Sequence, residues 1–213
     1  MSTTSAAEAN TPAKPVTKRR GSYAKTEARR KEILEAAFQV FASNGYRSGS
    51  IREVADIVGM SEAGMLHHFP SKVALLEGVL RTRDDHALET VDPAKQTGVE
   101  FIRGLITLAE FNSTIPGVVE LFCVLSAEST AADHPAHEYF RDRYDWVTRM
   151  VSDALTVMQN EGQLRPGIQP TGVAKTFIAL MDGLQVQWLL DRDALSMPEE
   201  LRRYARTFTD EPL

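Results

Sequence analysis

Apolar residues recur at three- and four-residue intervals along most of the chain, which is the period of an amphipathic helix. No stretch of useful length alternates apolar and polar residues, as a half-buried strand would. Proline and glycine interrupt the apolar stripes and divide the chain into separate segments. The pattern predicts an all-α fold of about nine helices. The first covers residues 26–44, the second starts at Ser50 and is interrupted at Gly59 after about two turns, and the third is a short helix between Ser61 and Phe69. The others are predicted over residues 72–88, 94–114, 118–131, 135–161, 171–191 and 198–209.

Serine residues predict where three consecutive helices begin, because a serine oxygen can accept a hydrogen bond from an amide of the first turn. Ser50 has a glutamate three residues later, which is the spacing of a capping box in which that glutamate reaches back to the cap. Gly59 permits a sharp turn before Ser61, and Ser71 precedes the next helix. Residues 50–69 therefore predict a helix-turn-helix, a unit that places its second helix in the major groove of DNA.

The charge of the chain is unevenly distributed. Residues 1–83 hold 13 Lys and Arg against 8 Asp and Glu, whereas residues 84–213 hold 11 against 21. A basic N-terminal part favours a module that binds a polyanion, although a solvated basic tail gives the same count. Residues 1–24 contain few large apolar side chains and are predicted to be a disordered basic arm, which either follows DNA phosphates or has no function.

The sequence from Gly59 to Leu76, GMSEAGMLHHFPSKVALL, resembles the signature of the TetR family of bacterial transcriptional regulators. Between Ile33 and Ala55 the stretches ILEAA, FASNGY and SIREVA resemble the same family. The likeness is close over residues 26–80 and is limited to helix number, length and spacing beyond them.

The resemblance implies a fold of two parts. Residues 25–72 would form an N-terminal helix-turn-helix DNA-binding domain, followed by a linking helix over residues 72–88. Residues 89–213 would form a helical domain that dimerises and binds a small molecule. In this family, ligand binding alters the distance between the two reading heads and releases the DNA.

The third predicted helix, between Ser61 and Phe69, is expected to carry the base contacts. Met65 and Phe69 are four residues apart and are predicted to point into the core, so the other side chains face outward. A Glu62 carboxylate can accept a hydrogen bond from a cytosine amino group, and Leu66 can pack on a thymine methyl group. The predicted DNA contacts are Arg47, Ser50, Arg52, Ser61, Glu62, Ala63, Gly64, Leu66, His67, His68 and Lys72.

Lys72 lies in the first turn of a predicted helix, where the helix dipole disfavours a cation. The position is explained if a DNA phosphate accepts hydrogen bonds from the ammonium group and from the first amides of the helix. Arg47, Ser50 and Arg52 are predicted to contact phosphates by the same logic. The alternative is that Lys72 is a solvated surface side chain.

Large apolar side chains are frequent in the C-terminal half, where they can line a ligand pocket or simply form core. The predicted pocket residues are Phe101, Leu105, Leu108, Phe111, Phe122, Met150, Phe177 and Trp188. Glu110, Asn112, Glu120, Glu128 and Gln185 lie among apolar neighbours and are candidates to orient the ligand.

Residues 171–191 are apolar nearly all round, so a helix there must meet its own core and a further partner. Gly172, Ala179 and Gly183 would allow close approach. Together with residues 198–209 this helix is predicted to form half of an intersubunit four-helix bundle, the alternative being a central helix of a monomer. The predicted dimer contacts are Phe177, Met181, Leu184, Trp188, Leu201 and Tyr204.

These patterns predict a homodimeric repressor that binds a partly palindromic double-stranded operator and is released by a small, largely apolar ligand. No cofactor is expected. His134 and His137 lack an evident third metal ligand, so a surface loop explains them better than a metal site. An activator, a ligand-independent DNA binder and a helical interaction module are the alternatives.

Neither catalysis nor a membrane is expected. The sequence has no glycine-rich phosphate loop, nucleophile elbow or paired-carboxylate motif, and Cys123 has no obvious base beside it. The longest run without a charged residue, Ala36 to Tyr46, is eleven residues, and a membrane-spanning helix needs about 20. With a single cysteine and no export signal, the chain is expected in the bacterial cytoplasm, on the nucleoid when bound to DNA.

Overall fold

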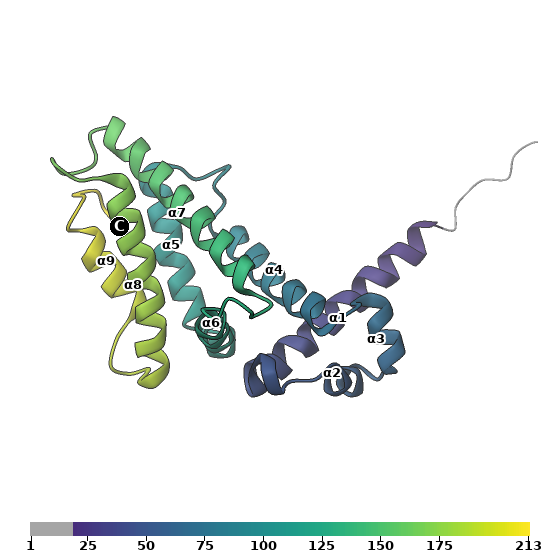
Figure 1. The fold of residues 1–213 in the computed structure, drawn as a ribbon. Helices are drawn as coiled ribbons and strands as arrows, with labels where there is room; N and C mark the ends of the chain where they lie inside the picture. The colour runs from purple at the N-terminus through teal and green to yellow at the C-terminus, as the bar shows by residue number, and fades with distance from the viewer. Residues whose placement is uncertain (1–18) are drawn as a thin grey trace, which may run out of the picture.

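The computed structural model describes residues 19–213, with side chains from residue 24 onward, and the part described contains nine α-helices (Figure 1). This agrees with the predicted all-α fold. The helices are α1 (Arg19–Ser48), α2 (Ile51–Val58), α3 (Glu62–His68), α4 (Lys72–Thr90), α5 (Gly98–Asn112), α6 (Pro116–Glu128), α7 (His137–Asn160), α8 (Pro170–Leu190) and α9 (Met197–Ala205).

The first helix is longer than the sequence predicts at both ends. α1 begins at Arg19 rather than Thr26, so residues 19–24 are helical and do not belong to a disordered arm. The rest of the predicted arm, residues 1–18, lies outside the described residues. At the other end the backbone breaks at Gly45 (φ 69°, ψ 171°), close to the predicted stop, but a helical turn continues to Ser48.

The predicted serine caps are present at the starts of three helices. Ser50, Ser61 and Ser71 each accept a hydrogen bond through Oγ from the backbone N–H three residues later, at 3.1 Å. The capping box is incomplete, because the Glu53 carboxylate accepts from Asn44 Nδ2 at 2.9 Å instead of reaching back to the cap. Glu53 therefore joins α2 to the end of α1.

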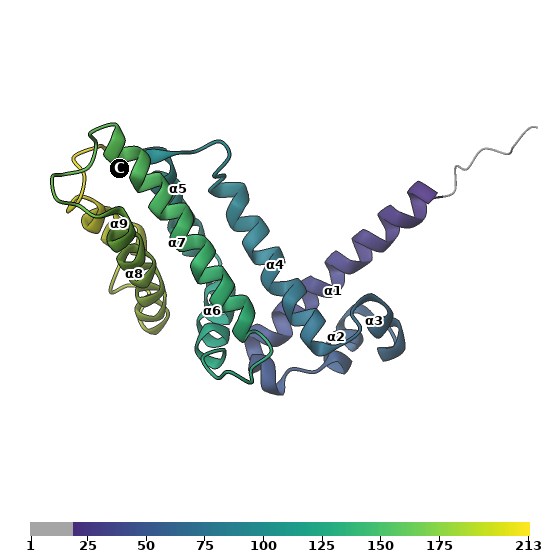
Figure 2. The same ribbon diagram turned by 45° about the horizontal axis from the view of Figure 1, so that its top comes forward.

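Two hydrophobic cores hold the molecule together. The first contains buried residues of α1 to α4, and includes Leu121, Phe122 and Leu125 of α6 and Phe140 of α7. The second lies among α5, α7, α8 and α9. Figures 1 and 2 show α1, α2 and α3 as a head at one end of the molecule, with α5, α7, α8 and α9 at the other end and α4 and α6 between them.

The end of the chain is tied back onto the second core. The predicted helix over residues 198–209 stops at Ala205, and Thr209 instead forms an isolated antiparallel bridge with Leu164. Thr209 Oγ1 also donates to the Gln163 carbonyl at 2.6 Å. Among the described helices, none is by itself long and apolar enough to cross a membrane.

Candidate DNA-reading head and ligand cavity

The short helix α3 is anchored by two side chains and presents the others outward. Met65 and Phe69 are 1% and 3% exposed, as their spacing predicted. Glu62, Ala63 and His67 are exposed, and Leu66 keeps 40% of its surface. The start of α3 is lined with small side chains, so its backbone can approach a ligand closely.

Two arginines of α1 hold the ends of α2 and α3, a role that the sequence analysis did not foresee. Arg29 Nη2 donates to the carbonyl of Val58, the last residue of α2, at 3.1 Å. Arg30 Nη1 donates to the carbonyl of His68, the last residue of α3, at 2.6 Å, and its guanidinium lies 4.3 Å from the centre of the Phe69 ring. Cations at helix C-termini are favoured by the dipole, so both contacts stabilise the head. The only sequence signal was the basic run at residues 29–31.

His68 lies beside this clamp and is mostly uncharged at neutral pH. Burial, and then the positive charges of His67, Arg30 and Arg29, lower the pKa of His68 below its ordinary 6.5. A neutral imidazole can both donate and accept a hydrogen bond, which suits contact with a base edge better than with a phosphate.

The predicted phosphate contacts lie around the end of α1 and the starts of α2 and α4. Arg47 and Arg52 are exposed, and Ser50 uses its hydroxyl oxygen as a cap. Lys72 is half-buried: its Nζ donates to the Arg47 carbonyl at 3.1 Å and lies 4.5 Å from the centre of the Tyr46 ring. Burial lowers the pKa of Lys72. The lysine thus has a partner within the protein at the end of α1, and keeps two further N–H donors for a phosphate.

The loop after α6 packs against the end of α1. The buried His134 ring is 5.3 Å from the Tyr46 ring, and its Nδ1 accepts from the Ala136 amide at 3.2 Å and pairs with Ser129 Oγ at 3.0 Å. Its Nε2 is 3.7 Å from Glu128 Oε2. Burial lowers the pKa of His134, and the nearby Glu128 opposes this effect.

His137, the other residue of the rejected metal site, also serves this loop. Its Nδ1 lies 2.8 Å from the Ser129 carbonyl, with which it is hydrogen-bonded. The two histidines therefore shape the connection between α6 and α7. Within residues 19–213, no group of three or more potential ligands is arranged to hold a metal ion.

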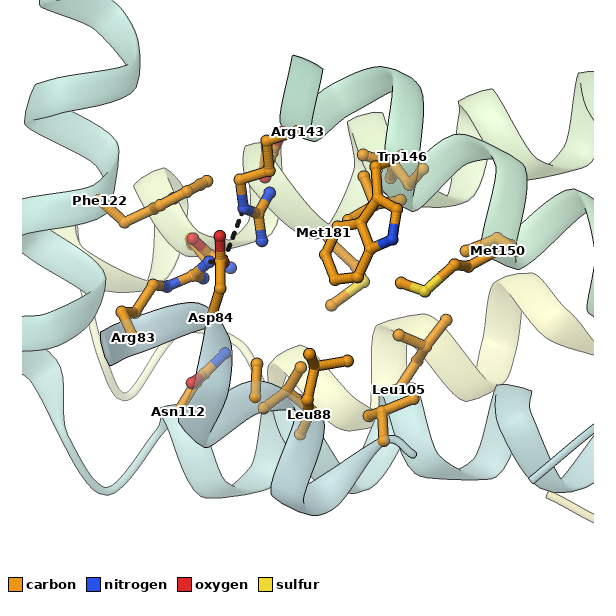
Figure 3. A pocket seen from close by; sticks show the side chains of 18 of the residues that line it. Arg83, Asp84, Leu88, Leu105, Asn112, Phe122, Arg143, Trp146, Met150 and Met181 are labelled. Atoms are coloured by element: carbon orange, nitrogen blue, oxygen red, sulfur yellow. Dashed lines mark hydrogen bonds and ion pairs between the residues drawn. The ribbon is translucent and has the colours of Figure 1, made fainter. Parts of the chain in front are cut away.

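A cavity lies between α4, α5, α6, α7 and α8 (Figure 3). Five of the predicted pocket residues line it: Phe101, Leu105, Leu108, Phe122 and Met150. The other three do not. Phe111 is 47% exposed, and Phe177 and Trp188 are 0% and 6% exposed within the second core.

Among the polar candidates, the structure brings only the amides to the cavity. Asn112 and Gln185 line it and are buried, with 6% and 4% of their surface exposed. Glu110 and Glu120 are exposed elsewhere, and Glu128 lies at the contact between α6 and α1.

One end of the cavity is charged, which the sequence analysis missed. Arg83 and Asp84 of α4 meet Arg143 of α7 (Figure 3). Asp182 of α8 also lines the cavity. Arg143 Nε donates to Asp84 Oδ1 at 2.9 Å, and Arg83 Nη1 lies 3.3 Å from the same oxygen. Tyr139 donates its hydroxyl to the other oxygen of Asp84. The residues come from helices far apart in the chain, so no local motif connects them.

The two guanidinium groups lie over one aromatic ring. Arg83 Cζ and Arg143 Cζ are 3.9 and 4.8 Å from the centre of the Phe122 ring. Burial and the nearby Arg143 lower the pKa of Arg83 to about 10, so it stays charged at neutral pH. Burial raises the pKa of Asp182, whose Oδ2 accepts from the Tyr144 hydroxyl at 2.7 Å.

Most predicted dimer contacts lie inside the protomer. Four of the six are at most 6% exposed, namely Phe177, Leu184, Trp188 and Leu201. Met181 lines the cavity, and the Tyr204 ring is 6.1 Å from the Phe177 ring. The prediction is corrected for the buried four, because side chains buried this deeply in the protomer have almost no surface left to bury against a partner.

The outward face of α8 carries a different set of residues. Gly172 and Ala179 are exposed, and a Cβ built at Gly183 would meet nothing within 4 Å. Val186 and Leu190 are 48% and 83% exposed. These five residues form a stripe of small and apolar side chains, which we call the α8 stripe.

Both parts of the chain match protein families of one kind. Residues 33–79 match bacterial regulatory proteins of the tetR family, and residues 118–213 match the C-terminal domain of BetI-type transcriptional repressors. The HTH-type transcriptional repressor KstR2 of Mycobacterium tuberculosis is 28% identical over 165 residues, which cover 76% of this chain and 81% of the relative.

Solved structures agree with this assignment. The structure of the ketosteroid transcriptional regulator KstR2 of Mycobacterium tuberculosis is 26% identical, has a TM-score of 0.63, and the match covers 86% of this chain and 96% of that one. A regulator from Saccharomonospora viridis in complex with choline is 23% identical with a TM-score of 0.72, covering 87% and 100%, and supports the fold.

Proposed function

The chain belongs to the TetR family of bacterial regulatory proteins, and from this premise we propose that it is a homodimeric transcriptional repressor released from a palindromic operator by a small ligand. The observation that carries the proposal is that one helix, α4, has its first turn in the reading head and its later turns on the cavity wall. We expect it to work in the cytoplasm, on the nucleoid when bound to DNA.

The reading surface is proposed to be the outward face of α3. Small side chains at Ala63 and Gly64 let the start of the helix enter the major groove, where Glu62 and Leu66 meet base edges. His67 and His68 flank them at the end of the helix. Ser61 and the residues around the end of α1, which are Arg47, Ser50, Arg52 and Lys72, are proposed to grip the phosphates.

The ligand is proposed to act through α4. Arg83 and Leu88 of this helix line the cavity, whereas Leu75 and Leu76 belong to the core of the head. A helix rises about 1.5 Å per residue, so Lys72 is about 24 Å from Leu88 along a single rigid element. A ligand that displaces the later turns therefore tilts the head, and two heads of a dimer lose their common spacing.

Dimerisation is proposed to use the α8 stripe. Val186 and Leu190 offer apolar surface that is otherwise open to water, and Gly183 lets a second helix approach closely. A two-fold axis beside α8 would put two copies of α3 on one face of the DNA, about 34–36 Å apart or at a multiple of that distance.

In vitro selection from random double-stranded DNA tests the proposal. We expect the full chain to enrich a partial palindrome, and Leu66→Ala to change the preferred bases within each half-site. Val124→Ala, which trims a side chain of similar exposure (37% against 40%) on α6, is the control and should leave the selected sequence unchanged. Enrichment of no sequence, or of a single site without symmetry, would contradict the proposal.

A further inference from the structure

The ligand cavity has two chemically different ends. Figure 3 shows Arg83, Asp84 and Arg143 gathered at one end with Asn112, and Leu105, Met150 and Trp146 at the other. A molecule that fills this space must therefore be apolar along most of its length and polar at one end.

The polar end holds hydrogen-bond donors that the protein does not use. A guanidinium has five N–H donors, and among the described residues Arg83 and Arg143 each commit one of them to a hydrogen bond, with Asp84. The Asn112 side chain, which is 6% exposed, also lines the cavity. Its amide can donate to or accept from a group bound there.

The carboxylates at this end are already engaged within the protein. Asp84 accepts from Arg83, Arg143 and Tyr139. Asp182 accepts from the Tyr144 hydroxyl. The remaining guanidinium N–H donors therefore face a site of low polarity, where a donor without an acceptor is costly.

A cationic head group fits this end poorly. It would lie beside two guanidinium groups, and the face of Phe122 that could stack on a cation is already taken by them at 3.9 and 4.8 Å. A quaternary ammonium ligand is therefore the natural opposing hypothesis, and the experiment includes one.

We propose that the cavity selects an amphipathic carboxylic acid. Its carboxylate accepts from the N–H donors of Arg83 and Arg143 that Asp84 leaves unused, at the end of the cavity that Asn112 also lines, and its hydrocarbon body lies against Leu105 and Met150. A planar carboxylate matches the guanidinium fork and supplies acceptor oxygens for these donors. This inference rests on the proposed function, because it takes this cavity as the site of the ligand that releases the repressor from DNA.

Three probes with the same ten-carbon chain test the head group: decanoate, decan-1-ol and decyltrimethylammonium. Isothermal titration of the full-length protein should give a dissociation constant for decanoate at least about tenfold lower than for either of the others, the usual scale of one charged hydrogen bond. Equal or tighter binding of the alcohol or the ammonium compound, or no binding of decanoate, would overturn the inference.

Two variants then locate the contact. Arg143→Gln should weaken decanoate binding by about tenfold or more and leave decan-1-ol binding unchanged. Arg103→Gln, at a partly exposed arginine of α5 outside the cavity, is the matched control. Since Arg143 also pairs with Asp84, Asn112→Leu is the second variant: it removes no hydrogen bond to any described residue, and should fold normally while weakening decanoate binding.

Loss of decan-1-ol binding in parallel with decanoate in both variants would mean that the residues only shape the cavity, and would overturn the inference. Titrations without DNA are independent of the operator. A protein that binds no palindromic DNA but prefers decanoate refutes the proposed function alone. A protein that binds the operator but does not prefer decanoate refutes the carboxylate assignment alone.

Discussion

Replacing Lys72 by methionine separates its contact with the protein from its proposed contact with DNA. The variant keeps an unbranched stem over Tyr46 but loses the ammonium that donates to the Arg47 carbonyl at 3.1 Å. A hydrogen bond contributes about 0.5–1.5 kcal/mol, and an exposed cation–π contact about 0.5–1 kcal/mol. The free energy of unfolding should therefore fall by about 1–2.5 kcal/mol, which for a chain of this size lowers Tm by about 2–10 °C.

The effect on DNA binding has a different signature, because it depends on salt. Each phosphate contact adds about 0.9 to the slope of log K against log salt, so a dimer that loses two contacts should lose about 1.8 from the slope. Between 50 and 200 mM salt, the affinity ratio of wild type to variant should then shrink by about twelvefold. A purely structural defect would give a ratio independent of salt.

Fluorescence anisotropy with a labelled operator over this salt range measures the slope, and light scattering checks that the variant stays dimeric. Lys95→Met is the control, because Lys95 is an exposed lysine, paired with Asp92, in the loop that follows the far end of α4 from the head. If Lys72→Met lowers the affinity equally at every salt concentration, or leaves it intact, then the phosphate assignment is wrong. Lys72 would then serve only to cover the end of α1.

Three further predictions follow from other parts of the molecule. Gly183→Glu should be a monomer by light scattering, and its fold should be unchanged because the new Cβ meets nothing within 4 Å. Ala94→Glu is the control and should stay dimeric. A dimeric Gly183→Glu would exclude the α8 stripe as the dimer interface. Burial raises the pKa of Cys123 from 9.0 to about 11, so at about pH 8 iodoacetamide should react about 100-fold more slowly with the folded than with the unfolded protein, and equal rates would contradict this. The pKa of His134 is lowered in the folded state, so its contribution to stability is present above the ordinary value of 6.5 and is lost as the pH falls below it. The Tm of His134→Asn should accordingly fall less than that of the wild type between about pH 7.5 and 5.5, and an equal fall would refute the assignment.

Local sequence signals predicted the positions of the short helices of the head well. α2 and α3 lie within about a residue of their predicted places, because Ser50, Gly59 and Ser61 act on amides and dihedral angles within a few residues of themselves. The start of α1 was missed because composition alone argued for disorder over residues 19–24, and the backbone there is helical nonetheless.

Structural features that depend on distant parts of the chain were predicted less well. Residues 171–191 are apolar nearly all round, and this pattern does not say which half of the helix faces its own core, so the buried Phe177 and Leu184 were placed at the dimer interface. The charged end of the cavity joins Arg83 to Arg143 and Asp182, pairs that no spacing rule connects. The one available signal was Asp182 itself, a carboxylate within an otherwise apolar segment.

The two arginines of α1 join the helices of the head into a single rigid body. α2 and α3 have eight and seven residues, and helices this short do not persist alone in water. Arg29 and Arg30 fasten the last carbonyl of each to one long neighbour, so all three helices must turn together when that neighbour turns. An operator is therefore released when an intact head is reoriented, and in the absence of DNA the amides of α3 should exchange as slowly with the small ligand bound as without it.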